Sequence, residues 1–229
     1  MLTKEKRRGF TLIEMLVVMA IIAVIAGLLI PGVLKAMRQA KVNKVLSEMQ
    51  HLATVLSQVY NEVGYYVRLE DLIKTDTTQI YVWEDAQDYE DGVSDDDLGD
   101  GTHGTLLSTL PTGNFWAGPY LTYKDFVQVS TPPGSGSRPI DPWGKTSDPN
   151  NALQHQYRLF WSTNPDLKPA GASGTMVIIS AGPDKVYQCG IPDNKTPINA
   201  KQSDFQNFDP VNNDKGDDIY FTFNAGIQQ

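Results

Sequence analysis

The sequence predicts an α+β fold in which one long N-terminal helix packs, through its second half, on a small antiparallel β-sheet. Three observations support this prediction. An apolar N-terminal segment changes into an amphipathic helical pattern that continues to residue 63, and three segments rich in β-branched and aromatic residues follow in the C-terminal third. The 14 Pro and 19 Gly residues indicate many loops.

Composition excludes several classes of protein. The chain has 229 residues and a net charge of −8, so it repels phosphate backbones and we expect no nucleic-acid partner. The single cysteine, Cys189, excludes an internal disulfide framework and a multi-cysteine metal cluster. The length suits one domain, or one domain with an appendage.

The first element is a basic leader followed by an apolar segment. Residues 1–9 contain four Lys or Arg residues and one Glu. Met15 to Leu34 are 20 consecutive uncharged, mostly apolar residues. A helix of that length spans roughly 30 Å, the thickness of bilayer hydrocarbon. The sequence therefore predicts a membrane-spanning segment over residues 10–34.

A cleaved secretory signal and a plain uncleaved anchor are the alternatives. The apolar run is too long for a secretory signal, and it ends in Pro31-Gly32 and Lys35 instead of a small-residue cleavage site. A plain anchor is consistent with the apolar pattern taken alone.

The junction between leader and apolar run is more specific. Gly9-Phe10-Thr11-Leu12-Ile13-Glu14 resembles the class III signal of type IV pilins and type II secretion pseudopilins. The resemblance implies that a prepilin peptidase cleaves between Gly9 and Phe10, removing leader 1–9, and that Phe10 is N-methylated. Residues 10–34 would then form the transmembrane and filament-core helix. Pro31 lies where this family commonly has a helix proline.

Glu14 begins the apolar run, where a carboxylate costs about 2.5–3.5 kcal/mol on insertion scales. The free amine of Phe10, on the same or a neighbouring subunit, would be its partner, although snorkelling to the headgroups is the alternative. Four Lys or Arg residues flank the segment on either side, so the positive-inside rule does not decide its orientation. A cytoplasmic N-terminus and a periplasmic head follow from the resemblance alone.

Residues 35–63 continue the helix with an amphipathic pattern. Apolar residues recur at alternating spacings of four and three, and Gly64 is a plausible stop. This stripe predicts the core face of a globular domain; a short coiled coil is the alternative. The helix would bend or melt locally at Pro31-Gly32. The stripe comprises Val45, Met49, Leu52, Leu56, Val59 and Val63.

Residues 64–229 predict a periplasmic or extracellular head. Strands are expected over 79–83, 156–162, 175–180 and 218–224, and an extended segment over 120–129. Residues 105–110 form a short, partly apolar segment that is interpreted as helical. The last three strands would form the antiparallel sheet.

The C-terminal third resembles, more closely, the major (G-type) pseudopilin of type II secretion. The motifs are Asp141-Pro-Trp-Gly144, Tyr157-Arg158, Ser180-Ala-Gly-Pro-Asp184 and Gly216-Asp-Asp-Ile219. The chain is much longer than the usual member, with the additional length in residues 65–138 and 185–215. This leaves open whether it is a major subunit, a minor subunit or a pilin of another system.

In that family the loop between the last strands binds Ca²⁺. The resemblance assigns Asp184, Asp217 and Asp218 as ligands, and Asp209 and Asp214 are further candidates. A solvated acidic loop is the alternative. Residues 84–100 hold nine carboxylates in seventeen positions, and Asp95, Asp97 and Asp100 would be a second site, although a solvated loop is favoured.

Catalytic motifs are few. Gly99-Asp-Gly101-Thr-His-Gly104 matches a dinucleotide fingerprint, but it follows an acidic run that would repel a pyrophosphate. The three histidines are scattered, and Cys189 is a lone thiol. We therefore expect no enzyme.

The predicted function is a structural subunit of a type II secretion pseudopilus that assists protein export. Its expected partners are further copies of itself, other pilin-like subunits, a prepilin peptidase and an inner-membrane assembly platform. The chain would be stored in the bacterial inner membrane and then enter a filament. A type IV pilin or minor pilin is the nearest alternative, and a membrane-tethered binding module or enzyme is the more distant one.

Overall fold

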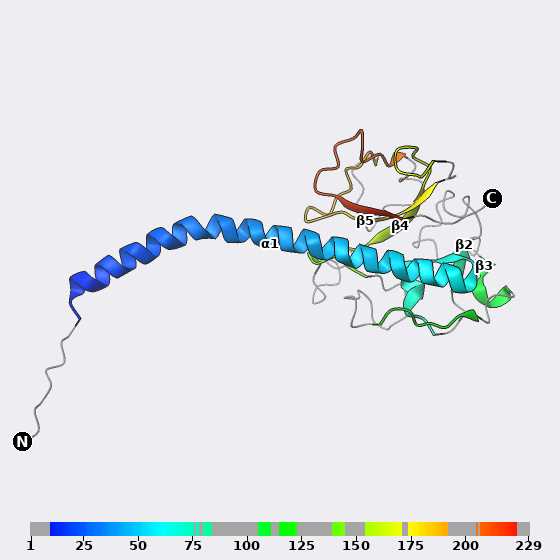
Figure 1. Cartoon of the computed structure of the whole chain (residues 1–229), viewed down its shortest axis with the longest axis horizontal. Helices are drawn as coiled ribbons and strands as arrows, with labels where there is room; N and C mark the ends of the chain where they lie inside the picture. Colours follow the sequence, from blue (N-terminus) through cyan, green and yellow to red (C-terminus); the bar gives the residue numbers. More distant parts are fainter. Residues whose placement is uncertain are drawn as a thin grey trace, which may run out of the picture. The chain divides into compact units, whose positions relative to one another are not determined.

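The computed structural model (Figure 1) forms two compact units, Met1–Val42 and Asn43–Gln229. Gly9, the acidic segment 84–100 and its Gly-rich motif, and residues 123–138 lie outside the described residues. The described residues are 10–75, 77, 80–83, 105–110, 115–122, 139–144, 154–170, 174–191, 205 and 207–223.

Helix α1 (Leu12–Val63) begins in the first unit. Every residue from Phe10 to Ala40 is exposed. By length and composition α1 can cross a membrane, and none of its most apolar window is buried. A bend or local melting was expected at Pro31-Gly32; the helix continues through Pro31, so the expectation of local melting is wrong. A proline removes one helical N–H, and α1 continues beyond this missing hydrogen bond to Val63.

The second half of α1 belongs to the second unit and has one buried face. All six members of the predicted stripe are buried, with exposed fractions between 0% and 1%. The helix ends where it was expected to end, because Gly64 adopts φ +87° and donates its N–H to the Tyr60 carbonyl at 2.8 Å. The amphipathic pattern therefore indicates the core face correctly.

The predicted C-terminal sheet is confirmed. Strands β4 (Arg158–Ser162), β5 (Thr175–Ser180) and β6 (Ile219–Phe223) form an antiparallel sheet in the order β4-β5-β6. Leu159 pairs with Ile178, and Ile178 pairs with Phe221. Strand β5 has the predicted bounds, whereas β4 and β6 are each two residues shorter than the segments that predicted them, since a side-chain pattern extends beyond the paired backbone.

This sheet has an apolar core on each face. Leu159, Trp161, Met176 and Ile178 belong to the cluster that contains the helix stripe. The alternating residues Phe160, Val177 and Ile179 belong to a second cluster. That second cluster adds side chains from the C-terminal loops, namely Tyr187, Cys189, Ile191, Phe205 and Phe208.

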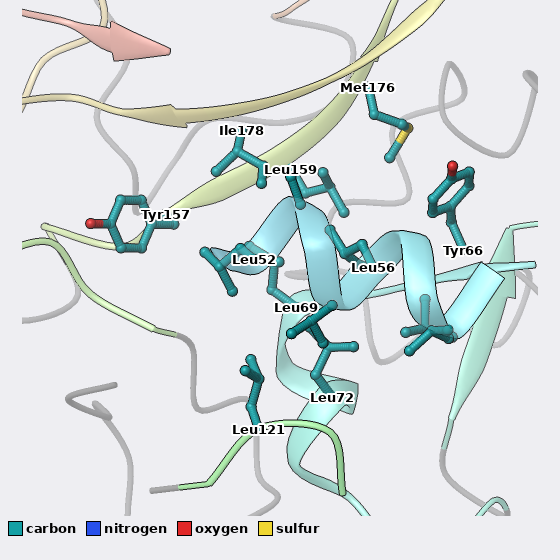
Figure 2. Packing of buried hydrophobic residues seen from close by; sticks show 14 of the residues in the cluster. Leu52, Leu56, Tyr66, Leu69, Leu72, Leu121, Tyr157, Leu159, Met176 and Ile178 are labelled. Atoms are coloured by element: carbon teal, nitrogen blue, oxygen red, sulfur yellow. The ribbon is translucent and has the colours of Figure 1, made fainter. Parts of the chain in front are cut away.

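Figure 2 shows how residues of the first cluster pack against the helix. Leu52 and Leu56 lie between Leu159 and Ile178 of the sheet and, on the other side, Leu69 and Leu72. The latter two lie on the 3₁₀ helix η1 (Leu69–Ile73), which begins six residues after the end of α1. The buried face of the helix therefore packs against two elements, the sheet and η1.

A second antiparallel sheet was not predicted as a sheet. It joins β1 (Tyr66–Val67), β2 (Tyr81–Trp83) and β3 (Thr105–Leu106). Its strands have only two or three residues, too short for a period-2 pattern. The expected strand 79–83 corresponds to β2, the expected segment 105–110 divides into β3 and the 3₁₀ helix η3 (Leu107–Thr109), and residues 120–122 form no strand.

Two tyrosines connect the helix to distant loops. The Tyr157 hydroxyl donates to Glu48 Oε2 at 2.5 Å, and the Tyr120 hydroxyl donates to Glu62 Oε2. Burial, followed by the Glu62 bond, raises the pKa of Tyr120 to about 12, so this phenol remains a donor at neutral pH. Burial, followed by the charge of the Glu48 carboxylate and its hydrogen bond, raises the pKa of Tyr157. These bonds fix the rotation of α1 about its own axis within the second unit.

The cluster around the helix stripe should dominate the stability of the second unit. Leu56 is fully buried, so Leu56→Ala should lower the free energy of unfolding by about 2–5 kcal/mol. Denaturant unfolding of the full chain in detergent, followed by near-ultraviolet circular dichroism, measures this change. The matched control is Val211→Ala, because Val211 is 57% exposed and its truncation should cost less than about 0.5 kcal/mol. Equal losses in both variants would contradict the assignment of Leu56 to the core.

Candidate functional site

The start of α1 is a capping box. Glu14 Oε2 accepts the Thr11 N–H at 2.8 Å and the Thr11 hydroxyl at 2.7 Å. In return, the Glu14 N–H donates to Thr11 Oγ1 at 3.3 Å. Thr-x-x-Glu before an apolar run is the sequence signature of this arrangement, in which each side chain satisfies a backbone donor at the helix start. Glu14 therefore has a defined partner within its own chain.

The other N-terminal site residues lie on the same segment. Phe10 directly precedes the capping box and is 70% exposed. Pro31 lies inside α1, also exposed. Gly9 lies outside the described residues, so the cleavage site is described on its Phe10 side only.

In the head, the Asp141-Pro-Trp-Gly144 motif forms a turn. Asp141 Oδ1 accepts the N–H groups of Trp143 at 3.0 Å and Gly144 at 3.3 Å, and the Asp141 carbonyl accepts the Gly144 N–H. Asp at the first position, Pro at the second and Gly at the fourth are the preferences of a type I turn. The motif is thus a structural one.

The buried carboxylate of Asp141 also fastens this turn to the sheet. Its Oδ2 accepts the Ser180 hydroxyl at 2.6 Å at the end of β5, and His155 Nδ1 lies 3.1 Å from Oδ1. Ser180 Oγ in turn accepts the Gly182 N–H at 3.2 Å. Two motifs that are 39 residues apart in the sequence therefore meet at one carboxylate.

The next turn brings the loop after β5 against the segment before β6. Gly182 has φ +64°, and a Cβ there would lie 2.5 Å from the Asp217 carbonyl oxygen. Only glycine accommodates both the backbone conformation and the close approach. The Asp184 N–H donates to Asp217 Oδ2 at 3.2 Å. Burial, and less strongly the neighbouring Asp184 carboxylate, raise the pKa of Asp217.

Asp218 is buried and connects the same two segments. Its Oδ2 accepts the N–H groups of Gln188 at 2.6 Å and Cys189 at 3.1 Å. Burial raises the pKa of Asp218 to about 6, against the opposing effect of these hydrogen bonds. Its other oxygen, Oδ1, and Gln188 Oε1 are buried acceptors without a hydrogen-bond donor among the described residues.

The remaining candidate ligands form hydrogen bonds within local turns. Asp209 Oδ1 accepts the N–H groups of Val211 and Asn212, and Asp214 Oδ1 accepts that of Gly216. The bonds from the Asn212 side chain and backbone lower the pKa of Asp209. Asp184 accepts the Val186 N–H at 2.8 Å and the Gln188 side-chain amide.

The predicted ligands are therefore brought together in part. Asp184 meets Asp217, and Asp218 meets Gln188 and Cys189 on the same pair of loops. Among the described residues, no three His, Cys, Asp or Glu side chains form a group that could hold a metal. A calcium ion here would need amide, carbonyl or water oxygens in addition, which Ca²⁺ accepts readily. The second candidate group, Asp95, Asp97 and Asp100, lies outside the described residues.

The other reactive side chains are dispersed. His51 is exposed on α1, and His155 is buried beside Asp141. Cys189 is buried, and burial followed by the Asp218 carboxylate raises the pKa of its thiol. A groove of about 680 Å³ between α1 and β6 contains one ionisable group, Glu62, which accepts from Tyr120. The described part of the chain shows no nucleophile with an adjacent base in an open cleft.

The roles of two residues were not identified from the sequence. Thr11 is part of the signal motif, and its spacing to Glu14 is also the signature of a capping box. Gln188 carries no sequence signal, because a glutamine in a loop becomes a candidate ligand only through the fold.

Comparisons with known proteins agree with the N-terminal geometry. Residues 4–30 match the protein family described as "Prokaryotic N-terminal methylation motif". Neither the curated proteins nor the solved structures give a match. The matched range contains Phe10, Thr11 and Glu14 together with most of the apolar segment. The chain therefore begins with a prokaryotic N-terminal methylation motif, the prepilin-type signal of type IV pilin-like proteins.

Proposed function

We propose that this protein is a non-catalytic structural subunit of a type II secretion pseudopilus. The observation that carries the proposal is the continuity of α1. Its first part exposes apolar side chains on all sides behind a prepilin-type signal, and its second part is the core helix of a folded head. The apolar part of such a helix is stable in a bilayer or in a bundle of identical helices. Transfer from the bilayer to the bundle would build a filament without exposing the apolar side chains to water.

The pseudopilus is favoured over a type IV pilus by the C-terminal motifs. The motifs that carry the resemblance to the major pseudopilin, namely the Asp141 turn, Ser180 and the Asp217-Asp218 pair, lie together around the end of β5 and the start of β6. A type IV pilin or minor pilin is the second candidate, and the additional length of residues 65–138 and 185–215 favours it. Neighbouring genes for a secretin and further pseudopilins would support the first candidate; a pilus operon would support the second.

The assembly step is a charge pairing at Glu14. Both capping bonds use Oε2, so Oε1 is the oxygen that the free amine of Phe10 on an adjacent subunit could reach. In hydrocarbon such a pair removes the cost of two isolated charges. The inner-membrane platform and prepilin peptidase would deliver the processed subunit to the growing end.

The head would then cover the outside of the filament, and Ca²⁺ would stabilise its C-terminal loop. The support for an ion is the pair of buried acceptors, Asp218 Oδ1 and Gln188 Oε1, beside the carboxylates of Asp184 and Asp217. An acceptor buried without a donor costs about 1–3 kcal/mol, and a bound cation would remove that cost.

Processing gives the first test. Intact mass spectrometry of chain isolated from cells with a prepilin peptidase should find a mature N-terminus at N-methyl-Phe10, nine residues shorter than the translated chain. The same chain from cells without the peptidase is the control and should retain Met1. An intact Met1 in both samples would refute processing and favour a simple membrane tether.

Assembly gives a second test, in which charge is separated from capping. Glu14→Gln retains an acceptor in the capping box but removes the charge, so it should insert into the membrane and yet fail to enter filaments. Glu14→Ala should fail likewise. The control is Thr11→Ala, which removes the capping hydroxyl, costs about 0.5–2 kcal/mol of helix stability and should still assemble. Sheared filaments quantified against membrane-bound subunit measure incorporation, and normal filaments from Glu14→Gln would refute the pairing.

Calcium gives a third test. At a calcium concentration about 100 times the Kd, the free energy of unfolding of the full chain should exceed that in chelator by about 2.7 kcal/mol. Asp218→Asn should abolish the difference, whereas Asp166→Asn, which changes an exposed carboxylate, should retain it. No shift in the native chain would count against a structural ion and would leave the filament role untouched.

A further inference from the structure

A group of cations follows the apolar segment of α1. Between Glu14 and Glu48 the sequence contains no carboxylate, and its charged residues there are Lys35, Arg38, Lys41 and Lys44. Lys44 forms an ion pair with Glu48, with 3.5 Å between Nζ and Oε1. The other three, Lys35, Arg38 and Lys41, all lie in the first unit and are called the basic collar here.

The basic collar occupies one side of the helix. Residues three apart on an α-helix are about 300° apart around the axis, so the three side chains lie within an arc of about 120°. Lys35 and Arg38 are exposed, and Lys41 is half-buried. The side of the helix that carries them therefore holds three cationic side chains over two turns.

The position of the basic collar relative to the bilayer follows from the length of the apolar segment. Met15 to Leu34 span roughly 30 Å as a helix, which matches the hydrocarbon thickness, so Lys35 begins at the boundary with the headgroups. Lys41 lies about 9 Å further along the axis. The headgroup layer is about 5–8 Å deep and the Debye length at physiological salt is about 8 Å, so all three cations experience the surface charge of the bilayer.

The chemistry of the collar favours one kind of partner. Lys and Arg have long apolar stems that allow the charged group to reach the headgroup level. The guanidinium of Arg38 can bind a phosphate through two hydrogen bonds. Because the collar contains no carboxylate, it gains more from lipids with a net negative charge than from zwitterionic ones.

We propose that Lys35, Arg38 and Lys41 form a binding site for the headgroups of anionic phospholipids, occupied while the subunit is stored in the membrane. The site rests on insertion of the apolar segment and does not depend on filament assembly or on calcium. Entry into a filament would require release of these lipids, so lipid charge would regulate the supply of subunits.

The test measures lipid selectivity at the protein boundary. The full chain is reconstituted in vesicles of equal parts phosphatidylcholine and phosphatidylglycerol, with spin-labelled phosphatidylglycerol or spin-labelled phosphatidylcholine as the probe. Electron paramagnetic resonance should show an association of the anionic probe that is at least about twofold stronger, and the preference should fall as salt is added. The combined variant Lys35→Gln, Arg38→Gln and Lys41→Gln should bind the two probes equally.

The matched control removes three cations from the head, Lys168→Gln, Lys185→Gln and Lys215→Gln, and should keep the preference. Equal association of both probes with the native chain, or a preference that survives in the collar variant, would overturn the proposal. Alkaline carbonate washing distinguishes the two reasons for which the native chain could lack a preference for the anionic probe. A native chain that washes off the vesicles refutes the membrane anchor itself. A native chain that resists washing but shows no preference for the anionic probe refutes the lipid site of the collar alone.

A second copy of the chain is the competing partner. Energy transfer between labelled copies in pure phosphatidylcholine should be the same for the native chain and the collar variant. A loss of transfer in the variant, together with equal association of the two lipid probes with the native chain, would assign the collar to a protein interface instead.

Discussion

The structure depends on one constraint, which is that a single helix must be stable in two different environments. In the first unit apolar side chains of α1 are exposed on every side, whereas in the second unit only one stripe is apolar and that stripe is fully buried. A helix satisfies its backbone hydrogen bonds internally in either environment. The boundary can therefore be set by side chains alone, and the cations from Lys35 onward mark it in the sequence.

Carboxylates carry much of the tertiary organisation of the second unit. Glu48 and Glu62 on α1 accept from tyrosines on distant segments, and Asp141 and Asp218 accept from backbone N–H groups of loops. Each of these bonds is charge-assisted and stronger than a neutral one. They fasten long loops in a chain whose single cysteine allows no internal disulfide. Asp141 and Asp218 are two buried acids at which segments far apart in the sequence meet.

Sequence reasoning identified the helix, its buried face, its end at Gly64 and the three C-terminal strands, because each has a period or a turn signal longer than a few residues. It missed the sheet of β1, β2 and β3, whose strands have at most three residues. It identified the Asp141-Pro-Trp-Gly144 motif but not the contact of Asp141 with Ser180, since that hydrogen bond joins residues 39 apart in the sequence. The role of Gln188 could not be predicted for the same reason, because Gln188 becomes a candidate ligand only when the loop after β5 meets the segment before β6.

The capping box gives a physical reason for an acid at the start of the apolar helix. The first N–H groups of a helix carry a partial positive charge, and cleavage before Phe10 would add a full positive charge, which N-methylation retains. Both lie at the edge of a segment of 20 uncharged residues, where an unbalanced charge is costly. Glu14 counters the helix charge through Oε2 within its own chain. A second subunit that offers its amine to Oε1 would complete the neutralisation; in the proposed filament, capping and assembly would then use different oxygens of one carboxylate and would not compete.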